Sequence, residues 1–253
     1  MNFTEKLTAA QQRNNSNLCI GLDIVLAELP LPLLYADEPM LPFARAIFEA
    51  THDLVCAYKI DLAYFFAEGA AGMVALERIA QIVPDAVPLI LDLGCSAPAA
   101  SAAAYARGAF VQYRADAAML WPQGREDIVD VFLKDNDKSV FVEFPSEEPA
   151  YTFHWLNRWQ GAYVAGRVGL VAHPHKADGM RLLRSRCPNV PFLMRSSDIG
   201  HHLAIRTHGP TKNGIKPIVS VGRELICASK SENYAEDMRQ AATYLRDRLN
   251  EAE

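Results

Sequence analysis

Three ionisable residues that could form an acid–base–acid chain lie at the ends of three apolar segments in the first half of this sequence. They are Asp23, Lys59 and Asp92, at or near the ends of segments 17–23, 54–60 and 87–92. A charge at the end of a buried strand is costly to desolvate unless a partner of opposite sign lies beside it. The three side chains would neutralise one another if the fold brought these ends together. The alternative is that each charge is solvated at its own strand terminus.

The elements that must position these residues are eight apolar segments separated by stretches of helical periodicity. The segments are continuous runs of apolar residues, as strands buried on both faces require. They are 17–23, 54–60, 87–92, 116–121, 139–144, 167–172, 190–194 and 217–221. Between them, apolar residues recur every three or four positions, for example over 43–50 and 234–249. Eight strands alternating with helices favour a closed (β/α)₈ TIM barrel over a doubly wound sheet.

Length and composition fit one α/β barrel domain spanning residues 1–253. Half of the residues are hydrophobic, which is enough for a large core, and the net charge of -5 argues against a nucleic-acid-binding surface. Apolar runs are too short to span a membrane, and the first residues lack a signal-peptide pattern. The five cysteines have no paired spacing, as expected of reduced thiols. We therefore expect a cytoplasmic protein that does not bind membranes.

In such a barrel, the residues at the carboxyl ends of the strands line the active site. Besides the three charged residues, this criterion selects Ser146, Arg195, Arg223 and four histidines: His173, His175, His201 and His202. Imidazole and carboxylate groups suit zinc, iron or manganese, so the histidines could form a metal site with Asp23 or Asp92. Histidine pairs in loops are more often solvated. Three arginines on the helix expected after the sixth strand are predicted to lie on its solvent-exposed face, outside the barrel: Arg181, Arg184 and Arg186.

The order of motifs along the chain resembles the longer bacterial type of orotidine 5′-phosphate (OMP) decarboxylase. The similarity covers nearly the whole chain, and four of its segments are 17–23 with the Pro-rich stretch behind it, 55–59, 65–69 and 220–229. The resemblance implies a TIM barrel of pyrimidine nucleotide biosynthesis that converts OMP to UMP and CO₂. It also implies a homodimer that pairs through the mouths of its barrels. We expect no cofactor.

The resemblance also implies a role for each matching residue. Asp23 and Lys59 would contact the ribose hydroxyls and hold the charge network, and Asp92 would press against the substrate carboxylate. Ser146 would face the pyrimidine, and Arg223 would bind the phosphate. These positions together describe a nucleoside monophosphate pocket.

Two positions of the family signature Asp-x-Lys-x-x-Asp differ in this chain. Asp92 keeps the first aspartate, whereas Gly94 replaces the lysine that protonates the carbon left by CO₂. Ala97 replaces the second aspartate, which reaches into the neighbouring subunit's site. Removal of a positioned proton donor forfeits about 10²–10⁴ in rate. We therefore expect weak or absent decarboxylation, unless Lys176 or Lys230 reaches inward from a loop as a substitute.

The segment after the seventh strand differs as well. The family has a Gly-rich turn there, whose backbone N–H groups hold phosphate. Here Arg195 could supply a guanidinium fork instead, although Asp198 would repel phosphate unless it turned away. Three functions remain open: a weak OMP decarboxylase, an inactive homologue that binds a phosphorylated small molecule or a partner subunit, and a repurposed metal-dependent enzyme.

Overall fold

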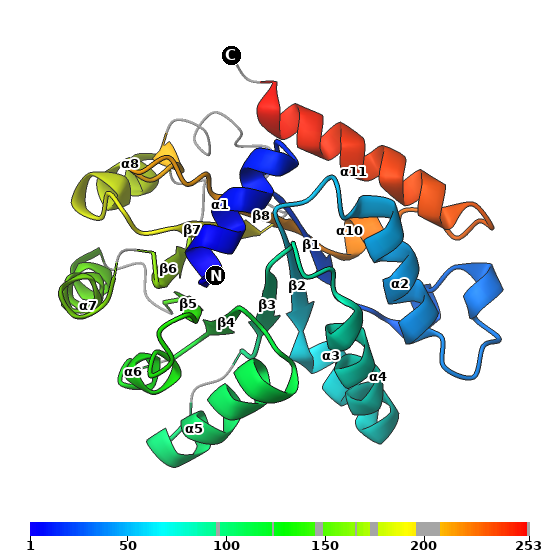
Figure 1. Cartoon of the computed structure of the whole chain (residues 1–253), viewed down its shortest axis with the longest axis horizontal. Helices are drawn as coiled ribbons and strands as arrows, with labels where there is room; N and C mark the ends of the chain where they lie inside the picture. Colours follow the sequence, from blue (N-terminus) through cyan, green and yellow to red (C-terminus); the bar gives the residue numbers. More distant parts are fainter. Residues whose placement is uncertain are drawn as a thin grey trace.

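The computed structural model describes residues 1–94, 97–122, 124–144, 149–164, 166–172, 177–195 and 208–251. Eight parallel strands form a closed barrel in which each strand pairs with its sequence neighbours and β8 pairs with β1 (Figure 1). The predicted (β/α)₈ barrel is therefore confirmed. This closure places the carboxyl ends of all eight strands at one end of the molecule.

Each of the eight predicted apolar segments overlaps one strand, and two of the strands, β2 and β7, extend one residue beyond their segments. The strands are β1 Leu18–Leu22, β2 Ala57–Asp61, β3 Leu89–Asp92, β4 Ala117–Leu120, β5 Ser139–Val142, β6 Val168–Val171, β7 Phe192–Arg195 and β8 Ile218–Val221. They are shorter than most of the apolar segments because buried residues also precede the hydrogen-bonded ladder. In the second segment, for example, Leu54, Val55 and Cys56 are buried but lie ahead of β2.

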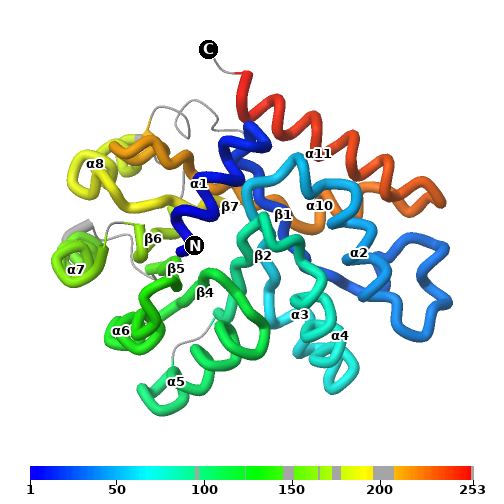
Figure 2. Tube along the Cα trace, viewed as in Figure 1, coloured from blue at the N-terminus to red at the C-terminus, as the bar shows by residue number. Residues whose placement is uncertain are grey.

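Helices surround the barrel and cover its outer face (Figures 1 and 2). The α-helices are α1 Phe3–Arg13, α2 Met40–Thr51, α3 Leu62–Ala67, α4 Gly69–Ile82, α5 Ala99–Arg107, α6 Ile128–Phe132, α7 Pro149–Ala162, α8 Ala177–Arg186, α10 Arg223–Ile226 and α11 Tyr234–Asn250. Two 3₁₀ helices, η1 Leu26–Glu28 and η2 Leu31–Leu33, follow β1, and a π-helical turn, η3 Gly108–Gln112, follows α5. None of the helices that the structure describes is long and apolar enough to cross a membrane.

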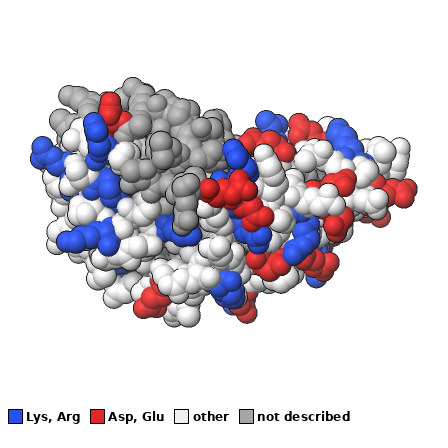
Figure 3. Space-filling model, turned by 90° about the horizontal axis from the view of Figure 1, so that it is seen from above, with Lys and Arg blue, Asp and Glu red and all other residues white. Residues whose placement is uncertain are grey.

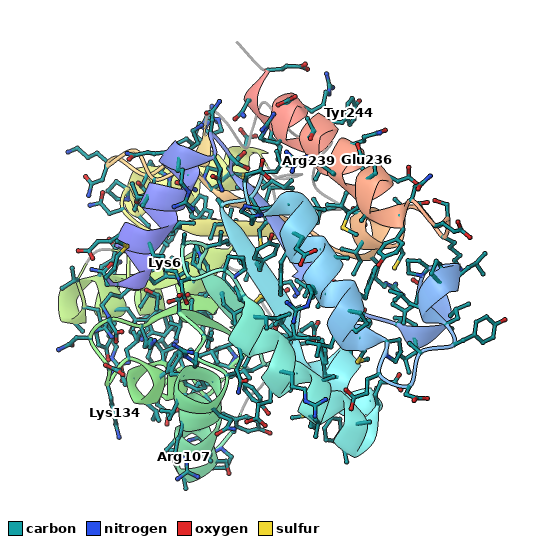
Figure 4. The ribbon with its side chains drawn as sticks, turned by 45° about the vertical axis from the view of Figure 1, so that its right-hand side comes forward. Lys6, Arg107, Lys134, Glu236, Arg239 and Tyr244 are labelled. Carbon is teal, nitrogen blue, oxygen red and sulfur yellow. The ribbon has the colours of Figure 1, made fainter. Side chains whose placement is uncertain are left out.

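Helix α1 closes the amino-terminal end of the barrel. Lys6, which Figure 4 labels on this helix, donates to Asp116 immediately before β4, at 2.7 Å. Gln11 exchanges hydrogen bonds of 2.8 and 3.1 Å with the backbone of Lys216, shortly before β8. Phe3 is buried in the smaller of the two clusters of hydrophobic core residues. The end of the barrel that α1 seals is thus structural, and the charged site lies at the other end.

Arg184 does not belong to a solvated face, which corrects the sequence-based expectation for the arginines of α8. Its guanidinium lies 3.9 Å from the ring centroid of Phe192, and burial lowers its pKa to about 10. It donates to the backbone carbonyl oxygens of Cys187, Pro188, Val190, His208 and Gly209. The side chain therefore joins the end of α8 to the segment before β8. Arg181 is exposed as expected.

Acidic and basic side chains are mixed with uncharged ones on the face of the molecule that Figure 3 draws. This distribution agrees with the modest net charge of -5.

Candidate active site at the carboxyl ends of the strands

The structure brings Asp23, Lys59 and Asp92 together at the mouth of the barrel. The Lys59 Nζ atom lies 3.4 Å from Asp23 Oδ1 and 3.6 Å from Asp92 Oδ2. The Lys59 and Asp92 side chains are each 8% exposed and that of Asp23 is 19% exposed, so these charges are not solvated strand termini. Desolvated charges at these distances stabilise one another, which fixes their positions for contact with a ligand.

Asp61 is a fourth charged residue of the site, and the sequence analysis missed it. It is the last residue of β2 and lies opposite Asp92 in the strand register. Its Oδ1 atom also accepts a hydrogen bond of 3.0 Å from the backbone N–H of Ala63, which caps α3. The signal that could have revealed it is its spacing of two from Lys59, because alternate residues of a strand share a face.

The ammonium group of Lys59 therefore interacts electrostatically with three carboxylates, those of Asp23, Asp92 and Asp61. Burial acts to lower the pKa of Lys59, but Asp23, Asp92 and Asp61 together raise it above its ordinary value. Burial raises the pKa of Asp92, Lys59 and Arg195 act to lower it, and Asp61 adds to the increase. The neighbouring carboxylates favour the charged form of Lys59, whereas burial is the main cause that disfavours the charged form of Asp92. Lys59 is consequently held protonated at neutral pH.

The carboxylate of Asp23 lies against the backbone of Gly222, directly after β8. A Cβ atom at position 222 would lie 2.3 Å from Asp23 Oδ2, well inside the contact distance of real side chains. Glycine at this position therefore permits the carboxylate to approach β8 closely. This contact locks the β1 end of the charge network to the strand that precedes Arg223.

Two arginines complete the charged mouth, and each is paired with a glutamate. Arg195, the last residue of β7, donates from Nη2 to Glu143 Oε2 at 2.6 Å. Arg223, the first residue of α10, donates from Nη1 to Glu28 Oε1 at 3.5 Å. They line a cavity of about 580 Å³ whose walls include Asp23, Glu28, Lys59, Asp61, Tyr64, Asp92, Arg195, Ser220, Gly222, Arg223 and Glu224. The cavity is large enough for a nucleotide-sized molecule.

Gly94 stands where the family signature has its lysine. It has a φ of +52°, and a Cβ atom built there would meet no atom of the described residues within 4 Å. Its backbone N–H donates to Asp92 Oδ1 at 3.2 Å. Ala97 is 7% exposed, so an aspartate there would be buried within its own subunit. A backbone N–H thus contacts Asp92 where the resemblance implies a side-chain ammonium.

Among the described residues, Lys59 is the lysine that lines the cavity. Lys230 is exposed beyond β8 and is absent from the cavity wall, which weighs against it as a substitute proton donor. Lys138 and Lys216 precede β5 and β8, and lie at the opposite end of the barrel. Lys176 lies outside the described residues.

Several other predicted site residues also lie outside the described part of the chain. They are Ser146, His173, His175, Asp198, His201 and His202. Within the residues that the structure describes, no group of three or more His, Cys, Asp or Glu side chains is arranged to hold a metal ion. The carboxylates at the mouth are organised around Lys59 instead.

Comparison with known proteins gives consistent relatives for this barrel. The chain is 33% identical over 98% of its length to orotidine 5′-phosphate decarboxylase of Thermomicrobium roseum, covering 95% of that protein. It is 35% identical over its full length to the enzyme of the same name from Roseiflexus castenholzii, covering 98% of it. The structure of Leishmania donovani OMP decarboxylase superposes with a TM-score of 0.75 at 26% identity, covering 98% of this chain and 99% of that one. No protein-family model matches the chain.

Proposed function

Because the chain belongs to the orotidine 5′-phosphate decarboxylase family, we propose that its barrel binds a pyrimidine nucleoside monophosphate but decarboxylates OMP slowly or not at all. The observation that carries this proposal is Gly94, which has no side chain and contacts Asp92 only through its backbone N–H, where the family signature has its lysine. The cavity is retained, and among the described residues Lys59 is the lysine that lines it.

Loss of CO₂ leaves an electron pair on the ring carbon, and that carbon must take up a proton from a group within hydrogen-bond reach. Lys59 is a poor donor, because its ammonium is held between Asp23 and Asp92 and its pKa is raised. Loss of a positioned donor costs about 10²–10⁴ in rate. Decarboxylation of OMP is very slow without a catalyst, so this loss removes useful turnover.

The binding half of the proposal is supported by Arg223. Its guanidinium lies at the start of α10, lines the cavity, and lies 5.9 Å from the ring centroid of Tyr64. Its side chain is 49% exposed, so N–H groups that do not contact Glu28 remain available to a phosphate. Lys59 and Asp23 supply a donor and an acceptor for hydroxyl groups deeper in the cavity.

Turnover is tested by incubating OMP with an excess of purified protein and measuring UMP by chromatography. We expect at most a trace of UMP, because the described residues of the cavity hold no free ammonium. Multiple turnovers at an ordinary enzymatic rate of about 1 s⁻¹ or more would contradict the proposal.

Binding of UMP is measured by calorimetry, and Arg223→Ala is expected to weaken it about tenfold or more, the usual loss for a charge-assisted hydrogen bond. The matched control is Arg158→Ala. Arg158 is similarly exposed (46%) and pairs with Asp130 at 2.6 Å, but it lies on α7 and not in the cavity wall. Equal affinities of the two variants would remove Arg223 from the phosphate site.

We also propose that two copies of the chain pair through their mouth faces. Large apolar side chains are exposed in the segments after β1, β2 and β4, namely Tyr35 (92%), Phe66 (73%) and Trp121 (41%). Exposed apolar groups at one end of a molecule favour association. Sedimentation equilibrium is expected to give a dimer that Phe66→Glu dissociates, and a wild-type monomer at micromolar concentration would refute the pairing.

A further inference from the structure

Glu28 lies beside the guanidinium group to which an anionic ligand of Arg223 would have to bind. Its Oε1 atom is 3.5 Å from Nη1 of Arg223, and both side chains line the cavity at the mouth. Two anions that share one guanidinium repel each other, and solvent screens this repulsion only in part at such short distances. A phosphate that reaches Arg223 therefore meets a carboxylate of the protein itself.

The backbone around Glu28 is held in place by the fold. Glu28 is the last residue of η1, and the residue that follows it, Leu29, is buried. The backbone N–H of Leu31 donates to the carbonyl oxygen of Lys230, beyond α10, at 3.2 Å. These contacts hold the segment after β1 against the segment after β8, so the carboxylate is presented to Arg223 by two packed elements.

Cys227 gives a second indication of where the Glu28 carboxylate lies. This residue directly follows α10, and burial raises the pKa of its thiol to about 11. Glu28 adds to this increase, whereas Arg223 acts against it, so the thiol lies within electrostatic reach of both members of the pair. Among the ion pairs of the described residues, the one that Glu28 forms is with Arg223.

The pair can nevertheless separate without leaving a buried charge. The side chain of Glu28 is 38% exposed, so it can turn into solvent while its backbone stays in place. Ion pairs with this degree of exposure contribute little to stability, which makes their separation inexpensive. A phosphate dianion carries more charge than a carboxylate and offers a guanidinium more acceptor oxygens. It should therefore replace Glu28 on Arg223.

We propose that Glu28 is an internal competitor for Arg223, which neutralises the guanidinium in the empty cavity and is displaced when a phosphate binds. Glu28 then lowers the affinity for the phosphate group of a ligand and has no effect on the affinity for its nucleoside part. The inference rests on the proposed binding of a nucleoside monophosphate, and it adds a residue that regulates how tightly the phosphate is held.

The test compares the affinities of UMP and uridine by calorimetry for the wild type and Glu28→Gln. The substitution keeps the shape of the side chain and removes its charge. We expect UMP to bind about two- to fivefold more tightly, the equivalent of one partly exposed ion pair. The affinity for uridine should not change, because uridine carries no phosphate. A gain of affinity cannot result from misfolding.

Glu224→Gln is the matched control. Glu224 lines the same cavity, and its substitution removes the same charge from the wall, but the described ion pair of Arg223 is with Glu28. Its gain in UMP affinity should stay below about 1.5-fold, the effect of a screened charge at longer range. In an Arg223→Ala background, Glu28→Gln should lose most of its effect on UMP, because the two residues act on the phosphate as a pair.

The contact between Glu28 and α10 is checked without a nucleotide by following alkylation of Cys227, resolved by mass spectrometry of its peptide. Glu28 contributes to the raised pKa of this thiol, so Glu28→Gln should lower the pKa and speed the reaction at about pH 8. An unchanged rate would show that Glu28 does not lie beside α10 in solution, and the inference would fail.

Three results with UMP would overturn the inference while the proposed function stands. Weaker binding by Glu28→Gln would show that Glu28 orients Arg223 for the phosphate. Unchanged binding would show that the two anions do not compete, and equal gains in Glu28→Gln and Glu224→Gln would reduce the effect to the overall charge of the wall. By contrast, a chain that binds UMP in none of these forms overturns the proposed function, whatever the rate of Cys227 alkylation.

Discussion

Replacing Gly94 with lysine is expected to raise the rate of OMP decarboxylation by about 10²–10⁴-fold over the wild-type chain. Among the described residues, no atom lies within 4 Å of a Cβ atom built at this position, so they leave room for the side chain. An ammonium near Asp92 would supply both the missing cation and a proton for the ring carbon. The measurement is UMP formation by both proteins under identical conditions with enzyme in excess.

The backbone sets a cost for this substitution. Gly94 has a φ of +52°, and an L-residue in this left-handed region loses roughly 1–2 kcal/mol of stability. Gly94→Met is the matched control, because it has the same backbone cost and a similar side-chain length but no charge. Equal OMP turnover by the lysine and methionine variants would show that the absent ammonium is not what limits this chain.

Replacing Lys59 with methionine is expected to lower the free energy of unfolding by about 3–5 kcal/mol at pH 7, the usual cost of leaving buried charges without their partner. Asp23 and Asp92 both lose the ammonium that lies 3.4 and 3.6 Å away. Urea denaturation of the two proteins measures the difference. Lys134→Met is the control, because Lys134 is exposed and projects away from the barrel (Figure 4). Its effect should stay within about 0.5 kcal/mol.

The loss in Lys59→Met should depend on pH in a definite direction. Burial already raises the pKa of Asp92 in the folded chain, and removal of Lys59 raises it further. A carboxyl group with a raised folded pKa destabilises the fold once ionised, so the penalty grows as pH rises above the unfolded value of about 3.9. The difference in unfolding free energy should therefore be smaller at pH 5 than at pH 7. A difference that grows toward acid pH would contradict the assignment of Lys59 as the partner of Asp92.

The barrel was predictable from the sequence because strands buried on both faces are continuous runs of apolar residues. Each apolar run overlaps one strand, and the residues at the ends of three runs form the Asp23–Lys59–Asp92 network. Parallel strands place their carboxyl ends together, so position in the run was enough to predict this contact. No knowledge of side-chain geometry was required.

What the sequence did not predict depends on contacts between distant segments. Arg184 lies among charged residues on an amphipathic helix, and only the folded chain shows that its guanidinium serves carbonyl groups as far away as Gly209. The pairing of Arg195 with Glu143 spans three strand positions of the barrel and has no local signal. Asp61 was missed for a different reason, because the predicted segment ended at residue 60, one position before it, and only the structure shows that Asp61 caps α3 and lies opposite Asp92.

The contacts of helix α1 have a consequence for the order of events during synthesis. This helix is made well before β8, yet Gln11 bonds to the backbone of Lys216, 205 residues further along the chain. A nascent chain that ends before β8 lacks both this contact and the strand that joins β1, so its early strands have unpaired edges while translation continues. The barrel therefore closes only after β8 has been made, and until then the unpaired edges of the early strands favour association with other chains.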